Sequence, residues 1–248
     1  MRSTALDFRF RFFIHAIIFV LGFWAPWCAA LGWTRGTTWL ALSSLLYRSG
    51  WLTFSAATNT VLLVAIVLLA LAAWLRLWGS AYVGAGIVQS QRMHGHTLLA
   101  DGPYRRTRNP LYLAILLHAI GLSILMPPSG AILCVVLVWL FQIRLALAEE
   151  SFLTAQLGNI YRAYKARVPR FLPAPTPQVP SGGAHPHWLQ GMLGEIYMLG
   201  AVVVFAAFGW GLNSNTLIRG ILIALGISII VRALLPRPQP VSEIPAAQ

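Results

Sequence analysis

The feature that most constrains this chain is a set of apolar stretches long enough to cross a lipid bilayer. A hydrocarbon core of roughly 30 Å needs about 20 mostly apolar residues per helix. Such stretches lie near 12–31, 58–78, 110–127, 130–147, 188–211 and 217–235. Charged residues are 10% of the chain, against about 25% in soluble domains. The sequence therefore predicts an all-α polytopic membrane protein with about six transmembrane helices.

The third and fourth stretches are short, and only "MPPSG" separates them. Pro127, Pro128 and Gly130 end one helix there and allow the chain to reverse. The sequence thus predicts a tight helical hairpin over 110–147.

The fourth stretch keeps its helical periodicity beyond the expected membrane interface. The pattern runs to Gly158, resumes to Arg167 and is closed by Pro169. We expect a cytoplasmic helical extension here, and a short interfacial helix around 38–47.

Composition divides the chain into four expected parts. Residues 173–187 read "PAPTPQVPSGGAHPH", and their Pro and Gly content predicts a linker that does not pack. The parts are an N-terminal transmembrane helix with an interfacial loop (1–57), a core that holds the site (58–173), the linker (174–187) and a C-terminal two-helix transmembrane hairpin with a tail (188–248).

The positive charges follow a pattern typical of membrane topology. If the N-terminus is cytoplasmic, only Arg35, Arg48 and Arg219 of the eighteen Lys and Arg residues fall outside the predicted cytoplasmic segments. This bias predicts a multi-pass protein of the cell membrane with both termini cytoplasmic. It also explains the net charge of +12 by anionic lipid and disfavours nucleic acid as a partner. Because Lys165 is the single lysine, a GC-rich bacterial genome, and hence a bacterial inner membrane, is the expected source.

The N-terminal stretch also has some features of a secretory signal, since small residues follow Cys28. Trp24, Trp27 and Trp33 instead favour an interfacial aromatic belt and a retained helix. Cys28 and Cys134 both lie in apolar stretches and are expected to pack.

Polar side chains concentrate in two segments, 94–112 and 144–170, which flank the predicted hairpin. A tight turn at one end of the hairpin brings both segments together at the other end. Polar groups near a membrane are costly, so such a cluster predicts a functional site. Its expected members are Arg105, Arg108, Asn109, Tyr112, Glu149, Glu150, Tyr161, Tyr164 and Arg170.

These residue types suit a ligand that combines several chemical groups. Arginines bind carboxylates through paired hydrogen bonds. Carboxylates can hold sugar hydroxyls, and tyrosine faces attract cations such as a sulfonium. S-adenosylmethionine presents a carboxylate, a ribose and a sulfonium together.

The motifs "GPYRRTRNPLY", a Glu-Glu pair and "LGNIYRAYKARVPRFLP" occur in this order around the hairpin. From about Trp74 to Pro173 the chain resembles the isoprenylcysteine carboxyl methyltransferase and phospholipid methyltransferase superfamily. The resemblance implies methyl transfer from S-adenosylmethionine to a lipophilic or small-molecule acceptor that enters from the bilayer.

The resemblance also implies roles for particular residues. Glu149 and Glu150 are expected to form one wall of the cofactor site, and Tyr161 and Tyr164 to close over it. Arg170 is expected to orient the acceptor, and Arg170 and Glu150 are the candidate catalytic residues. The opposite wall is assigned to Gly102, Pro103, Tyr104, Arg108, Asn109, Pro110 and Tyr112.

Asn109 stands where the carboxyl methyltransferases usually carry histidine, which leaves the acceptor open among a carboxylate, an amine and a thiol. A carboxylate or thiolate needs no base. An amine does, and Glu149, Glu150 or His118 could then serve. Two other functions fit the pattern less well: an NADPH-dependent reductase of the sterol-reductase type, and a non-catalytic membrane assembly factor.

Other polar residues have simpler interpretations. Arg105 and Arg106 can be explained by topology and lipid headgroups alone. His94 and His96 lack the Cys or acidic partners of a metal site, so no metal is expected. Glu195 is expected to form a structural ion pair with Arg232. The sequence carries no signal for the oligomeric state.

The glycines of "YVGAGIVQ" suggest a dinucleotide-binding loop at first sight. Gln89 stands where the third glycine belongs, and no strand precedes the motif, so this interpretation fails.

Overall fold

The computed structural model describes residues 8–25, 27–31, 36–84 and 98–234. Within these ranges the chain is helical and contains no β-strand. The elements are α2 (Arg11–Trp24), α3 (Trp27–Ala30), α4 (Thr38–Arg48), α5 (Phe54–Val83), η1 (Gly102–Arg105), α7 (Pro110–Ser123), α8 (Pro128–Leu157), α9 (Asn159–Arg167), α10 (Trp188–Gly194), α11 (Ile196–Gly211) and α12 (Ser214–Leu234).

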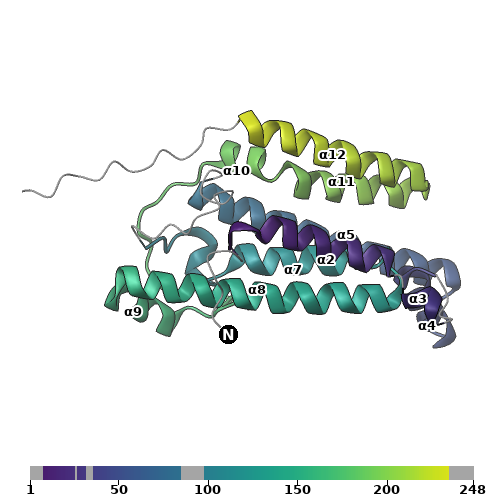
Figure 1. The fold of residues 1–248 in the computed structure, drawn as a ribbon, viewed down its shortest axis with the longest axis horizontal. Coiled ribbons are helices and arrows are strands. Elements are labelled where there is room, and N and C mark those ends of the chain that lie inside the picture. The colour runs from purple at the N-terminus through teal and green to yellow at the C-terminus, as the bar shows by residue number, and fades with distance from the viewer. Residues whose placement is uncertain (1–7, 26, 32–35, 85–97, 235–248) are drawn as a thin grey trace, which may run out of the picture.

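The helices form an elongated bundle (Figure 1). Helix α5 packs on α7, α7 packs on α8, and α2 lies against α8. Helices α11 and α12 form a hairpin that covers α5. Figure 1 shows α9 and α10 at one end of the bundle, and α3 and α4 at the other. The short helix η1 packs on α5.

Local sequence sets the helix ends. The Thr53 hydroxyl caps α5 by accepting a hydrogen bond from the Ala56 N–H at 3.2 Å. Pro110 and Pro128 each occupy the first position of a helix, where a missing N–H costs nothing. Gly158, with a φ of 55°, separates α8 from α9 as the sequence predicts.

The predicted hairpin is confirmed, and the count of about six transmembrane helices is not. Among the described residues, α5, α8 and α12 are long and apolar enough to span a membrane, and α10 with α11 makes a fourth span if the pair, bent by 69°, is counted as one. Helices α2 and α7 have 14 residues each, or about 21 Å of rise. Helix α2 stops early because Ala25 takes a left-handed conformation, which hydropathy does not report.

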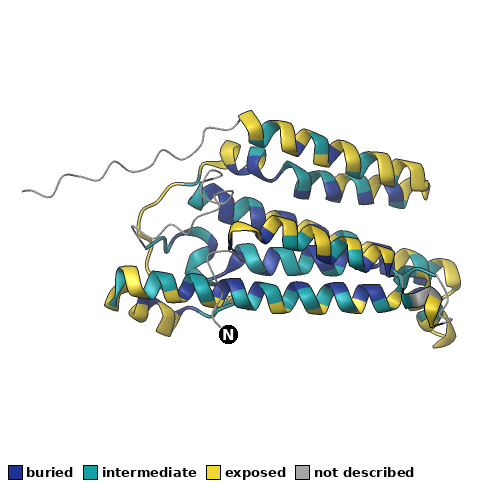
Figure 2. Cartoon of the chain, in the orientation of Figure 1, coloured by how far each residue is buried: buried dark blue, intermediate teal, exposed yellow. Residues whose placement is uncertain are grey.

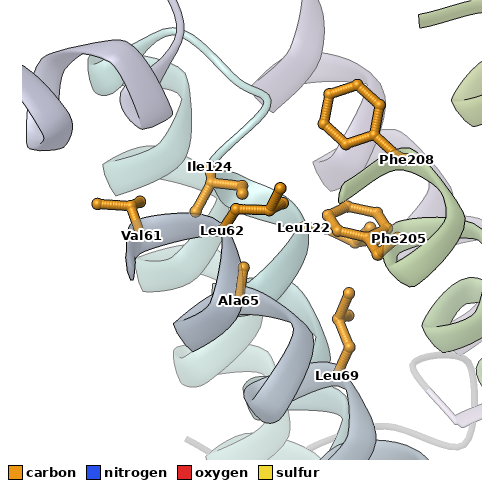
Figure 3. Packing of buried hydrophobic residues seen from close by; sticks show 8 residues of the cluster. All are labelled: Val61, Leu62, Ala65, Leu69, Leu122, Ile124, Phe205 and Phe208. Atoms are coloured by element: carbon orange, nitrogen blue, oxygen red, sulfur yellow. The ribbon is translucent and has the colours of Figure 1, made fainter. Parts of the chain in front are cut away.

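The apolar core lies between α5, α7 and α11 (Figure 3). Leu69 and Phe205 are fully buried there. Gly121 of α7 allows this contact, because a Cβ at that position would lie 2.8 Å from the Leu69 side chain. Large apolar residues of α12 such as Leu222 and Ile230 are exposed. Figure 2 shows much of α12 in the colour for exposed residues, as a lipid-facing helix requires.

The linker prediction is wrong in one respect, because residues 174–187 pack. The N–H of Ala174 donates to the Arg106 carbonyl at 2.9 Å, and the N–H of Gln178 donates to the Arg105 carbonyl at 2.8 Å. Asp101 accepts from the Ser181 hydroxyl at 2.5 Å and from two further backbone N–H groups. An extended, proline-rich segment exposes backbone groups that a neighbouring segment can bind. We call residues 174–187 the strap.

The expected Glu195–Arg232 ion pair is also wrong. Glu195 lies at the bend between α10 and α11, where it accepts hydrogen bonds from Arg76 Nε at 2.9 Å and from Ser80 at 2.7 Å. Arg232 instead donates to the Gly194 carbonyl at 3.3 Å. Because the bend turns Glu195 toward α5, Arg76 becomes its partner.

Candidate functional site

Two sequence motifs meet at the η1 end of the bundle and pair through their backbones. The Arg108 N–H donates to the Pro169 carbonyl at 2.9 Å, and the Asn109 N–H donates to the Arg170 carbonyl at 3.2 Å. The Thr107 hydroxyl contacts the same segment, with the Phe171 carbonyl at 2.9 Å. The two motifs that flank the predicted hairpin therefore lie in contact, as the hairpin implies.

Glu150 of α8 is the centre of this junction, with only 1% of its surface exposed. Arg170 binds it with two nitrogens, Nε at 3.0 Å and Nη2 at 3.1 Å. Asn109 donates to it from Nδ2 at 3.1 Å. Arg108 Nε lies 3.3 Å away and Lys165 Nζ 3.7 Å away. One buried carboxylate thus has three cationic neighbours.

This arrangement leaves positive charge in excess. The hydrogen bond to Glu150 raises the pKa of Arg170 despite an opposing effect of burial, so Arg170 remains charged. Arg108 Nε is buried and makes no hydrogen bond, although it lies near Glu150. A buried donor without an acceptor and a surplus of charge both suit an anionic ligand group.

Glu149, the neighbour of Glu150 along the chain, has different partners. Its Oε2 accepts a hydrogen bond from the Tyr112 hydroxyl at 2.6 Å. The two glutamates are therefore close in space but belong to two separate sets of contacts.

Arg11 of α2 is a residue of this region that the sequence analysis missed. It is buried, lies over the Phe8 ring with 4.1 Å from Cζ to the ring centroid, and is close enough to Tyr112 and Glu149 to interact electrostatically. It appears in the sequence as one of the charges before the first apolar stretch. The alternation of Arg and Phe in "FRFRFF" was the available signal, because arginine commonly lies over aromatic rings.

Tyr161 and Tyr164 of α9 are both buried, with ring centroids 5.7 Å apart. Tyr164 donates a hydrogen bond to the Tyr104 carbonyl at 2.7 Å and so joins α9 to η1. Burial raises the pKa of both phenols, which keeps them neutral. Val179 of the strap packs against this pair.

Three predicted site residues shape the backbone of the site. Gly102 has a φ of 56°, and a Cβ there would collide with the ring of Tyr82. Pro103 and Pro110 are buried, and their fixed φ suits the second position of η1 and the first position of α7. Their contribution to cofactor binding stays a prediction.

His118 is not brought to the Glu150 junction. It is buried in α7, and its Nε2 lies 3.4 Å from the Tyr197 hydroxyl of α11.

Arg105 and Arg106 both bind the strap. Arg105 Nε donates to the Val179 carbonyl at 2.9 Å, and Arg106 Nη1 donates to the carbonyls of Ala174 and Pro175. Their guanidinium groups therefore have contacts within the protein, beyond a role in topology or headgroup binding.

His94, His96 and the loop residues Gly86 and Gln89 lie outside the described residues. Within the part of the chain that is described, no group of three or more His, Cys, Asp or Glu is placed to hold a metal ion.

Comparison with known proteins identifies relatives of the segment that carries these residues. The phospholipid methyltransferase family matches residues 60–160. The Protein-S-isoprenylcysteine O-methyltransferase of Schizosaccharomyces pombe is 34% identical over 100 residues, which cover 38% of this chain and 42% of that protein. The enzyme of the same name from Mus musculus is 33% identical over 88 residues, covering 35% and 31%.

The chain thus spans less than half of the length of these curated relatives. No solved structure matches at a significant level. The family match includes Arg108, Asn109, Glu149 and Glu150 but ends before Arg170. Residues 60–160 are therefore similar to the phospholipid methyltransferase family, and the curated relatives of this part of the chain are Protein-S-isoprenylcysteine O-methyltransferases.

Proposed function

We propose that this protein is an integral-membrane methyltransferase that uses S-adenosylmethionine and acts on a lipophilic acceptor with an anionic head. The observation that carries the proposal is the Glu150 junction, in which Arg108, Lys165 and Arg170 surround a single carboxylate. The similarity of residues 60–160 to the phospholipid methyltransferase family supports the methyl transfer, and the excess positive charge supports the anionic ligands.

The residues present fit the proposed cofactor. Arg108 has a buried Nε without a hydrogen bond, which suits a carboxylate. Glu149 suits ribose hydroxyls, because a carboxylate bound by one tyrosine keeps further acceptor positions. The faces of Tyr161 and Tyr164 suit a sulfonium. Gly102, Pro103, Tyr104 and the Asn109–Tyr112 segment complete the proposed wall.

When bound, S-adenosylmethionine supplies a methyl group that its sulfonium already activates, so the protein needs no covalent nucleophile. The task of this chain is alignment and exclusion of water. Glu150 holds the guanidinium groups of Arg108 and Arg170 in place. Arg170, with 35% of its side chain exposed, is the more accessible of the two and is the residue we assign to the head of the acceptor.

A carboxylate or thiolate acceptor fits this site better than an amine. Asn109 uses its amide to donate to Glu150 and to the Arg170 carbonyl, and an amide does not exchange protons. Glu150 is surrounded by cations, and His118 lies against Tyr197. An amine acceptor would need a base, and Glu149, already bound by Tyr112, is the remaining one of the three candidates.

We also propose the cellular setting. The bias of positive charge supports a multi-pass protein of the cell membrane with both termini on the cytoplasmic side. The single lysine, Lys165, supports a bacterial inner membrane. The Glu150 junction then faces the cytoplasm, where S-adenosylmethionine is made. We propose that the chain has two main structural parts, the core over 58–173, which holds the site, and the C-terminal hairpin with its tail over 188–248.

Calorimetric titration of the purified protein with S-adenosylmethionine tests the proposal. We expect saturable binding that weakens more than tenfold in Glu150→Ala and in Arg108→Ala. Arg162→Ala is the matched control, because Arg162 is exposed and contacts Asn159.

Equal affinity in all four proteins would remove the proposed site. Binding of NADPH instead would favour the reductase alternative. Binding of neither compound would favour an assembly factor.

A further inference from the structure

Helix α2 packs on α8 in a register that two contacts fix. At one end the helices touch closely, because a Cβ placed on Gly22 would lie 2.9 Å from the Cβ of Cys134. Further along, the Gln142 amide donates a hydrogen bond to His15 Nε2 at 2.7 Å. Residue numbers fall along α2 as they rise along α8, so the two helices are antiparallel. The beginning of α2 therefore lies at the end of α8 that carries the two glutamates.

This register brings Arg11 to Glu149. Arg11 precedes His15 by about one turn, and the corresponding step on α8 leads from Gln142 to Ala146. Glu149 follows after about 4.5 Å of further rise. Side chains of a helix point toward its N-terminus, which in this antiparallel pair is the direction of Glu149. The electrostatic interaction of Arg11 with Glu149 agrees with this geometry.

Arg11 is held in this position through its backbone and its guanidinium group. His15 Nδ1 donates to the Arg11 carbonyl at 2.5 Å, so the ring that Gln142 binds also fixes the Arg11 backbone. The guanidinium lies over the rings of Phe8 and Phe12, with 4.1 and 4.7 Å from Cζ to the ring centroids. Only 8% of the Arg11 surface is exposed. Its charge therefore faces the protein interior.

Arg9 provides a contrast within the same segment. It stands two residues earlier in "FRFRFF", is exposed, and lies 5.7 Å from the centroid of the Phe10 ring. Membrane topology explains a charge at that position. The charge of Arg11 is buried, and a buried cation needs a compensating anion. Glu149 is the carboxylate with which Arg11 interacts.

We propose that Arg11 is a positioning residue of the cofactor site, which holds the Glu149 carboxylate in place for the ribose hydroxyls of S-adenosylmethionine. Tyr112 binds Glu149 Oε2 from α7, and Arg11 approaches the same side chain from α2. A carboxylate held from two helices keeps one orientation, which reduces the entropic cost of binding a ligand. The inference rests on the proposed function, because it takes Glu149 to contact the ribose.

The inference extends the site beyond the segment that matches known methyltransferases. The family match covers residues 60–160, whereas Arg11 belongs to α2. The cations of the Glu150 junction do not replace Arg11, because they surround the neighbouring carboxylate. Helix α2 is then part of the cofactor site as well as of the membrane-embedded bundle.

Calorimetry with two probes tests the inference on the full-length protein. The probes are S-adenosylhomocysteine and its 2′,3′-dideoxy analogue, which share the carboxylate and differ in the ribose hydroxyls. We expect the wild type to bind S-adenosylhomocysteine about tenfold more tightly than the analogue. In Arg11→Gln this preference should fall below about twofold, because Glu149 is no longer held. Arg9→Gln is the matched control and should keep the wild-type preference, since Arg9 is exposed.

Further variants separate positioning from a folding defect. Arg11→Lys keeps the charge and should retain most of the preference. Arg108→Ala should weaken both probes alike and leave the preference intact, because Arg108 is assigned to the carboxylate of the cofactor. Glu149→Gln should abolish the preference, and the addition of Arg11→Gln should cause no further loss, since Arg11 acts through Glu149.

An unchanged preference in Arg11→Gln would overturn the inference. So would a loss that Arg11→Lys does not restore, additive losses in the double variant, or a wild type that binds both probes equally. Failure of the proposed function has a different signature: the wild type then binds neither S-adenosylmethionine nor either probe.

Discussion

Two buried glutamates, Glu150 and Glu195, differ in the number of cations around them. Both are almost fully buried, at 1% and 2% exposure. Glu195 is matched by one arginine, Arg76, and by the Ser80 hydroxyl. Glu150 is surrounded by three cations as well as Asn109.

The difference separates a structural ion pair from a binding site. Burying a carboxylate is expensive, and one well-placed arginine with an added hydrogen bond offsets the cost. More cations around the same carboxylate repel one another and add strain, unless a second anion joins them. The matched pair at Glu195 therefore joins the C-terminal hairpin to α5, whereas the excess at Glu150 is suited to a ligand.

Breaking the matched pair should give the largest effect. Replacing Arg76 with Met leaves Glu195 buried without its counter-ion, which costs about 3–5 kcal/mol of stability. The double variant Arg76→Met, Glu195→Leu removes both charges and should return close to wild-type stability. Thermal unfolding in detergent measures both. If the single variant were as stable as the wild type, the pair would not join the hairpin to α5.

Removing one cation from the Glu150 junction should have a smaller effect on stability and a large one on activity. Arg170→Gln loses charged hydrogen bonds that are worth about 1.5–3 kcal/mol, so we expect a fall of tenfold or more in kcat/KM. Lys165→Ala is the control, because Lys165 is 3.7 Å from Glu150 and 43% exposed, and exposed pairs contribute about 0–1 kcal/mol. Similar losses in both variants would contradict a specific role for Arg170.

The sequence predicted the Glu150 junction but not the partner of Glu195, for a physical reason. A short turn between two apolar helices forces their far ends together, so the motifs on either side of 110–147 had to meet. The partner of Glu195 depends on how α10 and α11 bend, and no sequence pattern announces a bend of 69°. Depth along the helices favours Arg232 as the partner, but the bend brings Glu195 to Arg76 instead.

The strap and the helix lengths were missed for a related reason. The strap binds η1 through backbone groups, which every sequence offers equally. The left-handed Ala25 that ends α2 is not a residue type associated with that conformation. Composition predicts the membrane class and the hairpin, because these depend on summed apolar surface. It does not predict single backbone conformations.

The hydrogen bond between Tyr112 and Glu149 should have an intermediate effect. Tyr112→Phe removes the hydroxyl from the 2.6 Å contact and leaves the ring in place. A hydrogen bond to a charged group is worth at least about 1.5 kcal/mol net, so we expect an affinity for S-adenosylmethionine about tenfold weaker. Tyr47→Phe, at an exposed residue of α4, should change nothing. An unchanged affinity in Tyr112→Phe would exclude Glu149 from the site.

Asp101 provides a third case, a carboxylate held without a bound cation among its described contacts, and should give the smallest effect. Burial alone raises its pKa, but hydrogen bonds from Ser181, Ala184 and Gly182 outweigh this, and the net pKa lies below the ordinary value of 3.8. A lowered pKa means that the strap contacts are fully stabilising above pH 3.8 and are lost as the pH falls through the lower folded value. Hydrogen exchange of the strap amides, corrected for intrinsic rates, should therefore stay slow from pH 8 to about pH 4 and rise below that.

In Asp101→Asn the strap amides should exchange a fewfold faster at pH 7, because the amide replaces one acceptor by a donor, and the rise at low pH should disappear. Global stability should change by less than about 1 kcal/mol, since the strap opens locally. If protection were lost already between pH 5 and 6, Asp101 would not be the anchor. The strap would then depend on other contacts, such as the hydrogen bond from the backbone N–H of His187 to the Ala81 carbonyl. Asp101, unlike Glu150 and Glu195, would then have no measurable role. A pairing of opposite charges, as at Glu195, would be the better explanation of how the strap is held.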